Sequence, residues 1–495
     1  MPPPVSILVV TDWFPPASVG GVEAAAWALA LAAAGEGVRV AVLCPALPGG
    51  PLGVRAVRAP GGALVRIYYA PRGAGRVAGL TGGAAAWAPP SLPGVLALLR
   101  SVARRERTTT LHAHSTASPF SLATLAAARA LGLPAVLTDH SMAEKGGGRC
   151  WWAAAARAAW DAAAAGVAPA VVSAVSAAAA ADTAARLGRP PGGVTVLRNA
   201  IDGGALAPAA VSHAAAAAGA GAGAADPPST IRVLSVSRLT LRKGSGGLGS
   251  AIRAASAADP GLAFTVVGGG PGRADLVAGL GGGGGGGEQR AARLRPPPPR
   301  IALPGPRPPG AIPPLLACHD IFLSASATEA FGLAALEAAA VGLAVVAPDV
   351  GGVREALGGS VSGAAGWGRG GGGGARAAAV TLVPPSAGPA GLAAAVVAVA
   401  ADLRAGRGAT VPMPPPLAPL AAVLASHCWH GAAREAVGLY RAATVAWPPL
   451  PGRPLTRAAR AVVHALLVAW AAVLDALEPP GREPARVAVV EKKRV

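Results

Sequence analysis

The chain has 495 residues and a formal charge of +19, and 52% of its residues are hydrophobic. This length predicts two domains with a core in each, and the hydrophobic content excludes a disordered chain as the default. The arginines are scattered, with no basic stripe interleaved with aromatic residues, so we expect no nucleic-acid partner.

The first half of the chain alternates short apolar runs with a segment of helical period. Residues 5–11 predict a strand, residues 22–34 a helix and residues 38–44 a second strand. This order predicts a βαβ unit with a parallel sheet. Further strands are predicted at residues 135–138, 170–175 and 194–197. No basic segment precedes the first strand, so a signal peptide is not expected.

A second series of strands begins at residue 231 and predicts a second α/β domain. Its strands are predicted at residues 231–236, 263–267, 321–324 and 344–347. A helix is predicted at residues 333–341. Two such domains enclose a cleft, and open α/β sheets bind ligands beyond the carboxyl ends of their strands.

Composition divides the chain further. We expect an N-terminal domain, a low-complexity linker, a C-terminal domain, a helix that packs back and a membrane-associated tail, at residues 1–202, 203–230, 231–420, 421–445 and 446–495. In the tail, residues 461–474 are apolar and basic residues lie on both sides. Fourteen apolar residues are short for a membrane span, so a span and an interfacial helix both remain open.

Three short segments carry candidate ligand contacts. In the first, GGVE, a glycine pair ending at Gly21 precedes a helix, where backbone N–H groups bind phosphate, and Glu23 follows in the first turn. Glycine is abundant in this chain, and an acid in the first turn also complements the helix dipole, so chance and capping remain alternatives.

The second segment, SVSRLTLRKGSGGL, follows a predicted strand and carries Arg238 and Lys243. The chain has 4 Lys against 39 Arg, so a Lys at this place suggests a compact ammonium reaching a phosphate oxygen. The alternative is two solvated surface charges.

The third segment, TEAFGLAALEAAAVG, places Glu329 at the end of a loop and Glu337 two turns into the following helix. Carboxylates there accept hydrogen bonds from sugar and ribose hydroxyls, and the free N–H groups near Phe331 and Gly332 receive a diphosphate. The alternative is a capping acid and one further Glu.

Smaller signals lie at other predicted strand ends. His114 ends one strand, Asp139 and His140 end another, and the chain's single Asn, Asn199, closes the first series. There is no Asp-x-Asp motif and no CxxC pair, so we expect neither a metal-bridged diphosphate nor a zinc site or disulfide framework.

Together these motifs resemble the retaining glycosyltransferases of family 4, which have the GT-B fold of two Rossmann-like domains. The resemblance rests on the segments TDWFPP, GGVE, LHAHSTASPFS, TDHS, LRNAID, RLTLRKG and TEAFGLAALEAA. The details are similar to members that transfer N-acetylglucosamine from UDP-GlcNAc to phosphatidylinositol in glycosylphosphatidylinositol anchor synthesis. This implies the endoplasmic reticulum membrane, catalytic domains facing the cytosol, partner subunits of a transferase complex, and no cofactor or metal.

The resemblance also implies roles for individual residues. In the donor site, Arg238 and Lys243 hold the diphosphate beside Gly21, Glu337 binds the ribose and Glu329 the donor sugar. Phe331 and Gly332 complete that site. His114 contacts the sugar at the reacting face, so the residues implied in catalysis are His114, Glu329, Arg238 and Lys243. Residues implied on the acceptor side, in the N-terminal domain, are Glu23, Asp139 and His140.

The chain departs from the family pattern in four ways. The segment VGGGPG lacks the acidic residue that the family has there, and Arg198 replaces a proline. The apolar tail segment is shorter than the membrane span of the family, and the glycine runs enlarge loops. Two alternatives therefore stay open: a family 4 enzyme with a different lipid or soluble acceptor, and a catalytically silent scaffold of the same fold.

Overall fold

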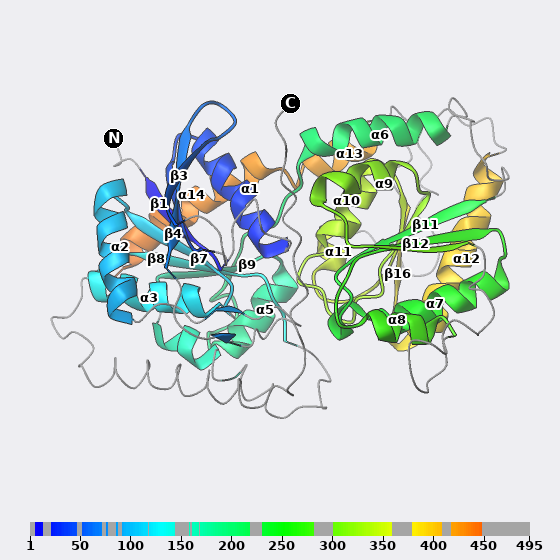
Figure 1. The fold of residues 1–495 in the computed structure, drawn as a ribbon, viewed down its shortest axis with the longest axis horizontal. Helices are drawn as coiled ribbons and strands as arrows, with labels where there is room; N and C mark the ends of the chain where they lie inside the picture. Colours follow the sequence, from blue (N-terminus) through cyan, green and yellow to red (C-terminus); the bar gives the residue numbers. More distant parts are fainter. Residues whose placement is uncertain are drawn as a thin grey trace.

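The computed structural model describes residues 5–12, 21–46, 52–71, 76–77, 86–87, 92–116, 118–143, 158, 161–167, 169–217, 230–281, 300–358, 379–407 and 417–447. They form two α/β domains that lie side by side (Figure 1). The predicted tail segment, residues 461–474, and most of the glycine and proline runs lie outside the described residues.

The N-terminal domain is built on an eight-stranded sheet of order β10-β9-β8-β7-β1-β2-β4-β3. Its strands are β1 (Ser6–Val10), β2 (Arg39–Pro45), β3 (Gly53–Arg58), β4 (Leu64–Ala70), β7 (Thr110–His114), β8 (Ala135–Asp139), β9 (Val171–Ala174) and β10 (Thr195–Val196). The pairs are parallel except β3 with β4. Two short strands, β5 (Arg76–Val77) and β6 (Ala86–Trp87), form a separate antiparallel pair.

Helices cover this sheet. They are α1 (Gly21–Gly35), α2 (Leu92–Glu106), α3 (Pro119–Leu131) and α5 (Ala177–Arg186). Helix α14 (Trp429–Ala446), from the far end of the described chain, also lies here and packs against α1, β7, β8 and β9 (Figure 1). Strands β1, β7 and β8 are buried along their whole length, as expected when helices cover both faces of a parallel sheet.

The C-terminal domain has a six-stranded parallel sheet of order β13-β12-β11-β14-β15-β16. Its strands are β11 (Ile231–Val236), β12 (Leu262–Val267), β13 (Ile301–Gly305), β14 (Ile321–Leu323), β15 (Ala344–Pro348) and β16 (Val380–Val383). Its α-helices are α6 (Gly203–Ala217), α7 (Ser245–Ala258), α8 (Arg273–Gly279), α9 (Ile312–Ala317), α10 (Leu333–Val341), α11 (Val353–Ala356), α12 (Gly388–Arg407) and α13 (Ala418–Leu424). The 3-10 turns are η1 (Leu241–Lys243), η3 (Pro309–Ala311) and η4 (Pro385–Ala387).

Two parallel-sheet domains confirm the predicted α/β class. The structure differs from the predicted linker, because residues 203–217 of the 203–230 segment form α6. The Ala-rich composition favours a helix, and the Asp202 carboxylate accepts a hydrogen bond from Ala205 N at 3.1 Å. Leu206 and Ala210 are buried where α6 packs on α9 and α10.

Among the described residues, the stretch Pro385–Ala405 is long and apolar enough by length and composition to cross a membrane. It overlaps α12, whose Val396 and Ala400 side chains are fully buried where the helix packs on α7 and β15. Of this stretch 28% is buried, and the helix covers one face of the C-terminal domain through its contacts with α7 and β15.

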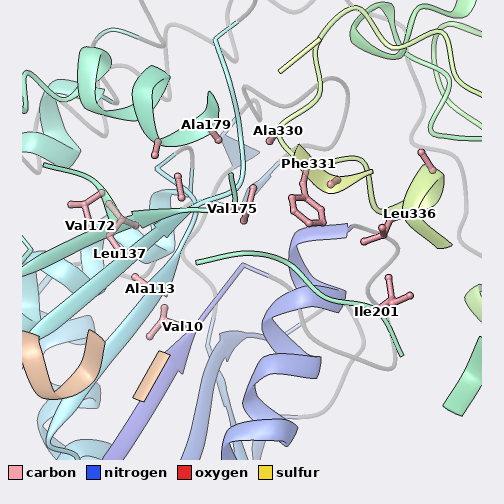
Figure 2. Close-up of a cluster of buried hydrophobic side chains, with 14 of the residues drawn as sticks. Val10, Ala113, Leu137, Val172, Val175, Ala179, Ile201, Ala330, Phe331 and Leu336 are labelled. Carbon is pink, nitrogen blue, oxygen red and sulfur yellow. The ribbon is translucent and has the colours of Figure 1, made fainter. Parts of the chain in front are cut away.

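The two domains share a continuous apolar core at their junction. Figure 2 shows Val175 and Ala179 of the N-terminal domain close to Ala330 and Phe331 of the C-terminal domain, with Ile201 of the crossover segment nearby. The arrangement fixes the loops at the carboxyl ends of the two sheets relative to each other.

Polar contacts reinforce this junction. The Ser176 hydroxyl donates to Ala330 O at 2.6 Å. The Glu355 carboxylate accepts from Ala177 N at 2.6 Å and from Arg198 Nε at 3.1 Å. Glu355 therefore ties α11 of one domain to the start of α5 and the crossover segment of the other.

Candidate active site

The loops that follow β11 and β14 in the C-terminal domain pack against one another. Ala327 N donates to Arg242 O at 2.9 Å. Gly244 has a φ of +68°, and a Cβ there would lie 1.9 Å from Ala325 O. Gly268, after β12, has a φ of +151°, and a Cβ there would lie 1.8 Å from Ser237 O. Glycine is required at both positions by conformation and by space.

This packing brings Lys243 and Glu329 together. Lys243 ends η1, Glu329 lies in the loop before α10, and the ammonium and carboxylate form an ion pair. Their side chains are 26% and 19% exposed, so both remain accessible to a ligand. The Glu329 carbonyl accepts from Gly352 N at 3.0 Å, which anchors the loop to the glycine pair after β15.

Glu337 lies on the second turn of α10, which begins after Gly332 in the left-handed conformation, φ 100°. Burial raises the pKa of the Glu337 carboxyl from 4.5 to about 7. Among the described residues, this carboxyl has no hydrogen-bond partner. A partly buried carboxyl without a hydrogen-bond partner, near the start of a helix, can accept hydrogen bonds from the hydroxyl groups of a ligand.

The other residues of that loop differ in accessibility. The Phe331 side chain is 2% exposed and its ring packs on His427 with centroids 5.6 Å apart. It is a core residue, and its backbone is the part that remains for a ligand. By contrast, a Cβ on Gly21 at the start of α1 would meet no atom of the described residues within 4 Å.

Glu23 and Arg238 face each other across the two domains. Burial raises the pKa of the Glu23 carboxyl, and the positive charge of Arg238 opposes that shift. Arg238 is exposed on the loop after β11.

Asp12, which follows β1, was not among the predicted site residues. Its pKa is raised to about 7, chiefly by burial, and the Ser118 hydroxyl donates to it at 2.7 Å. Its position just after a predicted strand is the feature of the sequence that could have identified it as a site residue.

Three histidines gather at the carboxyl ends of β7 and β8. His114 Nδ1 and His140 Nε2 are 2.9 Å apart, and the ring of His112 lies against that of His114 with centroids 4.2 Å apart. His112 Nδ1 is 2.9 Å from the Tyr440 hydroxyl on α14, and its Nε2 is 2.7 Å from Thr138 Oγ1. His112 and Tyr440 were not predicted, because nothing local links residues so far apart in the chain.

Burial keeps these imidazoles neutral. It lowers the pKa of His112 to about 3 and that of His140 to about 4, and the pKa of His114 lies well below 6.5. The buried Nε2 of His114 has no hydrogen-bond partner among the described residues. A neutral imidazole with one ring nitrogen engaged and the other unpaired is prepared for a single hydrogen bond to a ligand.

Asp139 turns away from this cluster. Its fully buried carboxylate is paired with Arg186, which also binds Asp161 at 2.6 Å and Asp182 at 2.7 Å. Thr116 Oγ1 donates to Asp139 at 3.1 Å. This network fastens α5 to the end of β8, so Asp139 holds the neighbouring loop in place.

The cluster formed by Asn199 and its neighbours lies at the domain junction. Asn199 is 8% exposed and lines a cavity of about 310 Å³ with Arg198, His427 and Cys428.

In the part of the chain that the structure describes, no group of three or more His, Cys, Asp or Glu side chains is arranged to hold a metal ion.

Two parallel-sheet domains whose carboxyl-end loops lie at their junction have the arrangement of the GT-B fold, and the family models that match the chain are those of glycosyltransferases. The family model Glycosyltransferase Family 4 matches residues 19–203, and Glycosyl transferases group 1 matches residues 230–402.

Relatives and solved structures agree with this class. The chain is 30% identical over 368 residues to a phosphatidylinositol N-acetylglucosaminyltransferase subunit from Arabidopsis thaliana, covering 72% of this chain and 70% of the relative. It is 29% identical over 355 residues to the corresponding human subunit, covering 71% and 63%. Sucrose-phosphate synthase from Thermosynechococcus elongatus (TM-score 0.60, 19% identity, 88% and 98% covered) and Anabaena HepE (TM-score 0.55, 18% identity, 88% and 99% covered) share the fold.

The chain belongs to the family of these phosphatidylinositol N-acetylglucosaminyltransferase subunits, within the family 4 glycosyltransferases. It spans 63% of the length of the human relative.

Proposed function

We propose that this glycosyltransferase moves N-acetylglucosamine from UDP-GlcNAc to phosphatidylinositol, with retention of anomeric configuration and without a metal ion. The names of the relatives supply the sugar and the acceptor. The observation that carries the chemistry is the accessible Lys243–Glu329 ion pair beside the start of α10.

In the donor site, Lys243 and Arg238 hold the diphosphate, and the N–H groups at Phe331 and Gly332 add the positive end of α10. Glu337, ionised, accepts hydrogen bonds from the ribose hydroxyls. Binding separates the Lys243–Glu329 pair, so that the ammonium turns to phosphate and the carboxylate to the sugar.

In the reaction, the acceptor hydroxyl attacks the anomeric carbon from the face that UDP leaves. The bond between that carbon and the β-phosphate oxygen breaks, and the departing phosphate oxygen takes the acceptor proton. Lys243 and Arg238 stabilise the charge that develops on UDP. His114 donates or accepts one hydrogen bond at the sugar through its unpaired Nε2.

On the acceptor side, Glu23 in the first turn of α1 and His140 after β8 line the approach to the sugar, and Asp139 supports that loop from behind. Gly21, at the start of α1, faces the diphosphate of the donor. The enzyme works at the endoplasmic reticulum membrane with both domains in the cytosol and with other subunits of the transferase. The apolar segment at residues 461–474 brings it to the bilayer, since apolar burial and attraction to anionic lipid add.

A transferase assay tests this function. Microsomes from cells that express the chain are supplied with labelled UDP-GlcNAc, and microsomes with Lys243→Ala serve as the control. We expect label on phosphatidylinositol in the first sample alone. Label on another lipid would replace the acceptor, and UDP binding without any product would favour a silent scaffold.

A further inference from the structure

The hairpin of β3 and β4 forms an uncovered edge of the N-terminal domain. Strand β3 is the last strand of its sheet, and all six of its residues are exposed. The turn between β3 and β4 projects beyond the helices of the domain (Figure 1). Large apolar side chains stand out on this hairpin, with Leu52 67%, Val54 45%, Val57 37% and Leu64 46% exposed.

The charge of this part of the chain is one-sided. Residues 37–105 contain nine arginines and no aspartate, glutamate or lysine. The next acid, Glu106, is 2% exposed, and its carboxylate is bound by Arg66 at 3.1 Å and by the Tyr68 hydroxyl. The exposed charges among the described residues of this range are therefore positive, and the exposed acid Glu36 lies just before it.

Arginines stand among the apolar side chains of the hairpin. Arg55 and Arg58 are exposed on β3 itself. Arg105, at the end of α2, acts electrostatically on Tyr68 of β4, and Arg55 acts on Tyr69, so α2 adds charge beside the hairpin. We call Leu52, Val54, Arg55, Val57, Arg58 and Leu64 the hairpin surface.

We propose that the hairpin surface docks on an anionic phospholipid membrane. Apolar side chains that enter the headgroup region and arginines that meet lipid phosphates add in free energy. Glu36, an exposed acid whose neighbour Gly35 lies beside Pro60 of the turn, opposes the contact, but the exposed Arg55, Arg58 and Arg105 outnumber it. Arginine on an edge strand also guards against pairing with other strands. Protection of the edge strand does not explain the four exposed large apolar side chains, whereas a lipid surface would contact both the arginines and the apolar side chains.

The strand register places one end of this surface at the edge of the sheet that carries the site loops. Gly53 pairs with Tyr69 near the carboxyl end of β4, and Arg58 pairs with Leu64 at the opposite end. Because β4 runs parallel to β2, its carboxyl end lies at the edge of the sheet that carries the site. The hairpin surface therefore runs from the edge of the sheet that carries the site loops, at Leu52, to the projecting turn, and docking would bring the bilayer to that edge.

Vesicle binding by the full-length chain tests the proposal. The vesicles are phosphatidylcholine, alone or mixed with phosphatidylserine, and the variants are Arg55→Glu with Arg58→Glu, and Val54→Ser with Val57→Ser. We expect the charge variant to bind the mixed vesicles about tenfold or more weakly, and the difference to shrink as salt is added. The serine variant should bind both kinds of vesicle more weakly.

Matched controls keep net charge and the C-terminal tail constant. Arg307→Glu with Arg441→Glu removes the same charge from exposed positions elsewhere, and Val211→Ser with Val445→Ser removes exposed valines there. Thermal unfolding verifies that each variant folds. If hairpin and control variants bind alike, the proposal is overturned, and the free edge of β3 becomes a candidate for pairing with a protein strand. Binding needs no donor or acceptor sugar, so this outcome is independent of the proposed transfer reaction.

Discussion

The two domains carry polar groups of different kinds at the carboxyl ends of their strands. In the C-terminal domain, Lys243 and Glu329 are charged, paired with each other and partly exposed. In the N-terminal domain, His114 is buried and His140 is partly buried, and the two are neutral and hydrogen-bonded to each other. The difference indicates separate roles for the two domains. The C-terminal domain supplies charged side chains that can leave their ion pair to bind a diphosphate, and the N-terminal domain supplies neutral hydrogen-bonding groups held in place.

The largest effect should follow removal of a cation on the charged side. Lys243→Ala and Arg238→Ala are each expected to lower turnover by ~10²-fold or more, because lost electrostatic stabilisation of a leaving group has that magnitude. Arg307→Ala, at an exposed position of the same domain, is the control and should leave turnover unchanged. If turnover in the Lys243 or the Arg238 variant stays within threefold of that of the unmodified enzyme, the assignment of these residues to the diphosphate site is wrong.

The two glutamates should fail differently. Glu337→Gln is expected to weaken UDP binding and raise KM by about tenfold, because ribose contacts exist in both ground and transition states. Glu329→Gln should lower kcat by ~10-fold or more and nearly retain UDP affinity, because it acts on the sugar as the bond breaks. Calorimetry with UDP beside steady-state kinetics separates these effects, and the reverse pattern would exchange the two assignments.

Acidity should affect the charged side first. The raised pKa of Glu337, about 7, means that its carboxyl is protonated below pH 7 and ionised above it. The ionised form accepts the ribose hydroxyls, so UDP affinity should rise by up to about tenfold between pH 6 and pH 8. In Glu337→Gln this dependence should flatten. Affinity that falls as the pH rises would contradict the role of the carboxylate.

In the N-terminal domain, the expected loss of activity is smaller, and we test it at Tyr440, which positions the ring of His112. Tyr440→Phe removes the hydroxyl 2.9 Å from His112 Nδ1 and should lower kcat about fivefold with KM unchanged, the effect of one net hydrogen bond. Thr444→Val, one turn further along α14, is the matched control, because the Thr444 hydroxyl contacts Thr110 at 3.4 Å and the backbone carbonyl of Tyr440 at 2.9 Å but no histidine side chain.

Nitrogen NMR of His112 decides whether Tyr440 acts on the ring. A change of tautomer in Tyr440→Phe and none in Thr444→Val is expected. Loss of stability in both variants with the tautomer and kcat unchanged would make Tyr440 a packing residue.

The smallest expected effect is that of chelation. If Lys243, Arg238 and the start of α10 neutralise the diphosphate, activity should survive EDTA unchanged. Loss of activity with EDTA that magnesium or manganese restores would show that a metal ion shares this task.

Local pattern was enough to predict the elements that carry the charged side. The strand before Arg238 and the helix that holds Glu337 follow from hydrophobic periodicity, and α10 spans Leu333–Val341 as expected. The buried ring of Phe331 could not be predicted in the same way, because an apolar residue after a strand can face either a ligand or the core.

By itself, the sequence determined the α/β class, the two series of strands, the loops at their carboxyl ends and the family. Those properties depend on periodicity and on short motifs, which are local. The tertiary structure decided which side chains meet. It joined His112 to Tyr440 across 328 positions, turned Asp139 inward to Arg186, and left the β3 edge exposed. Such contacts depend on how helices pack on the sheets, so no local pattern of residues specifies them.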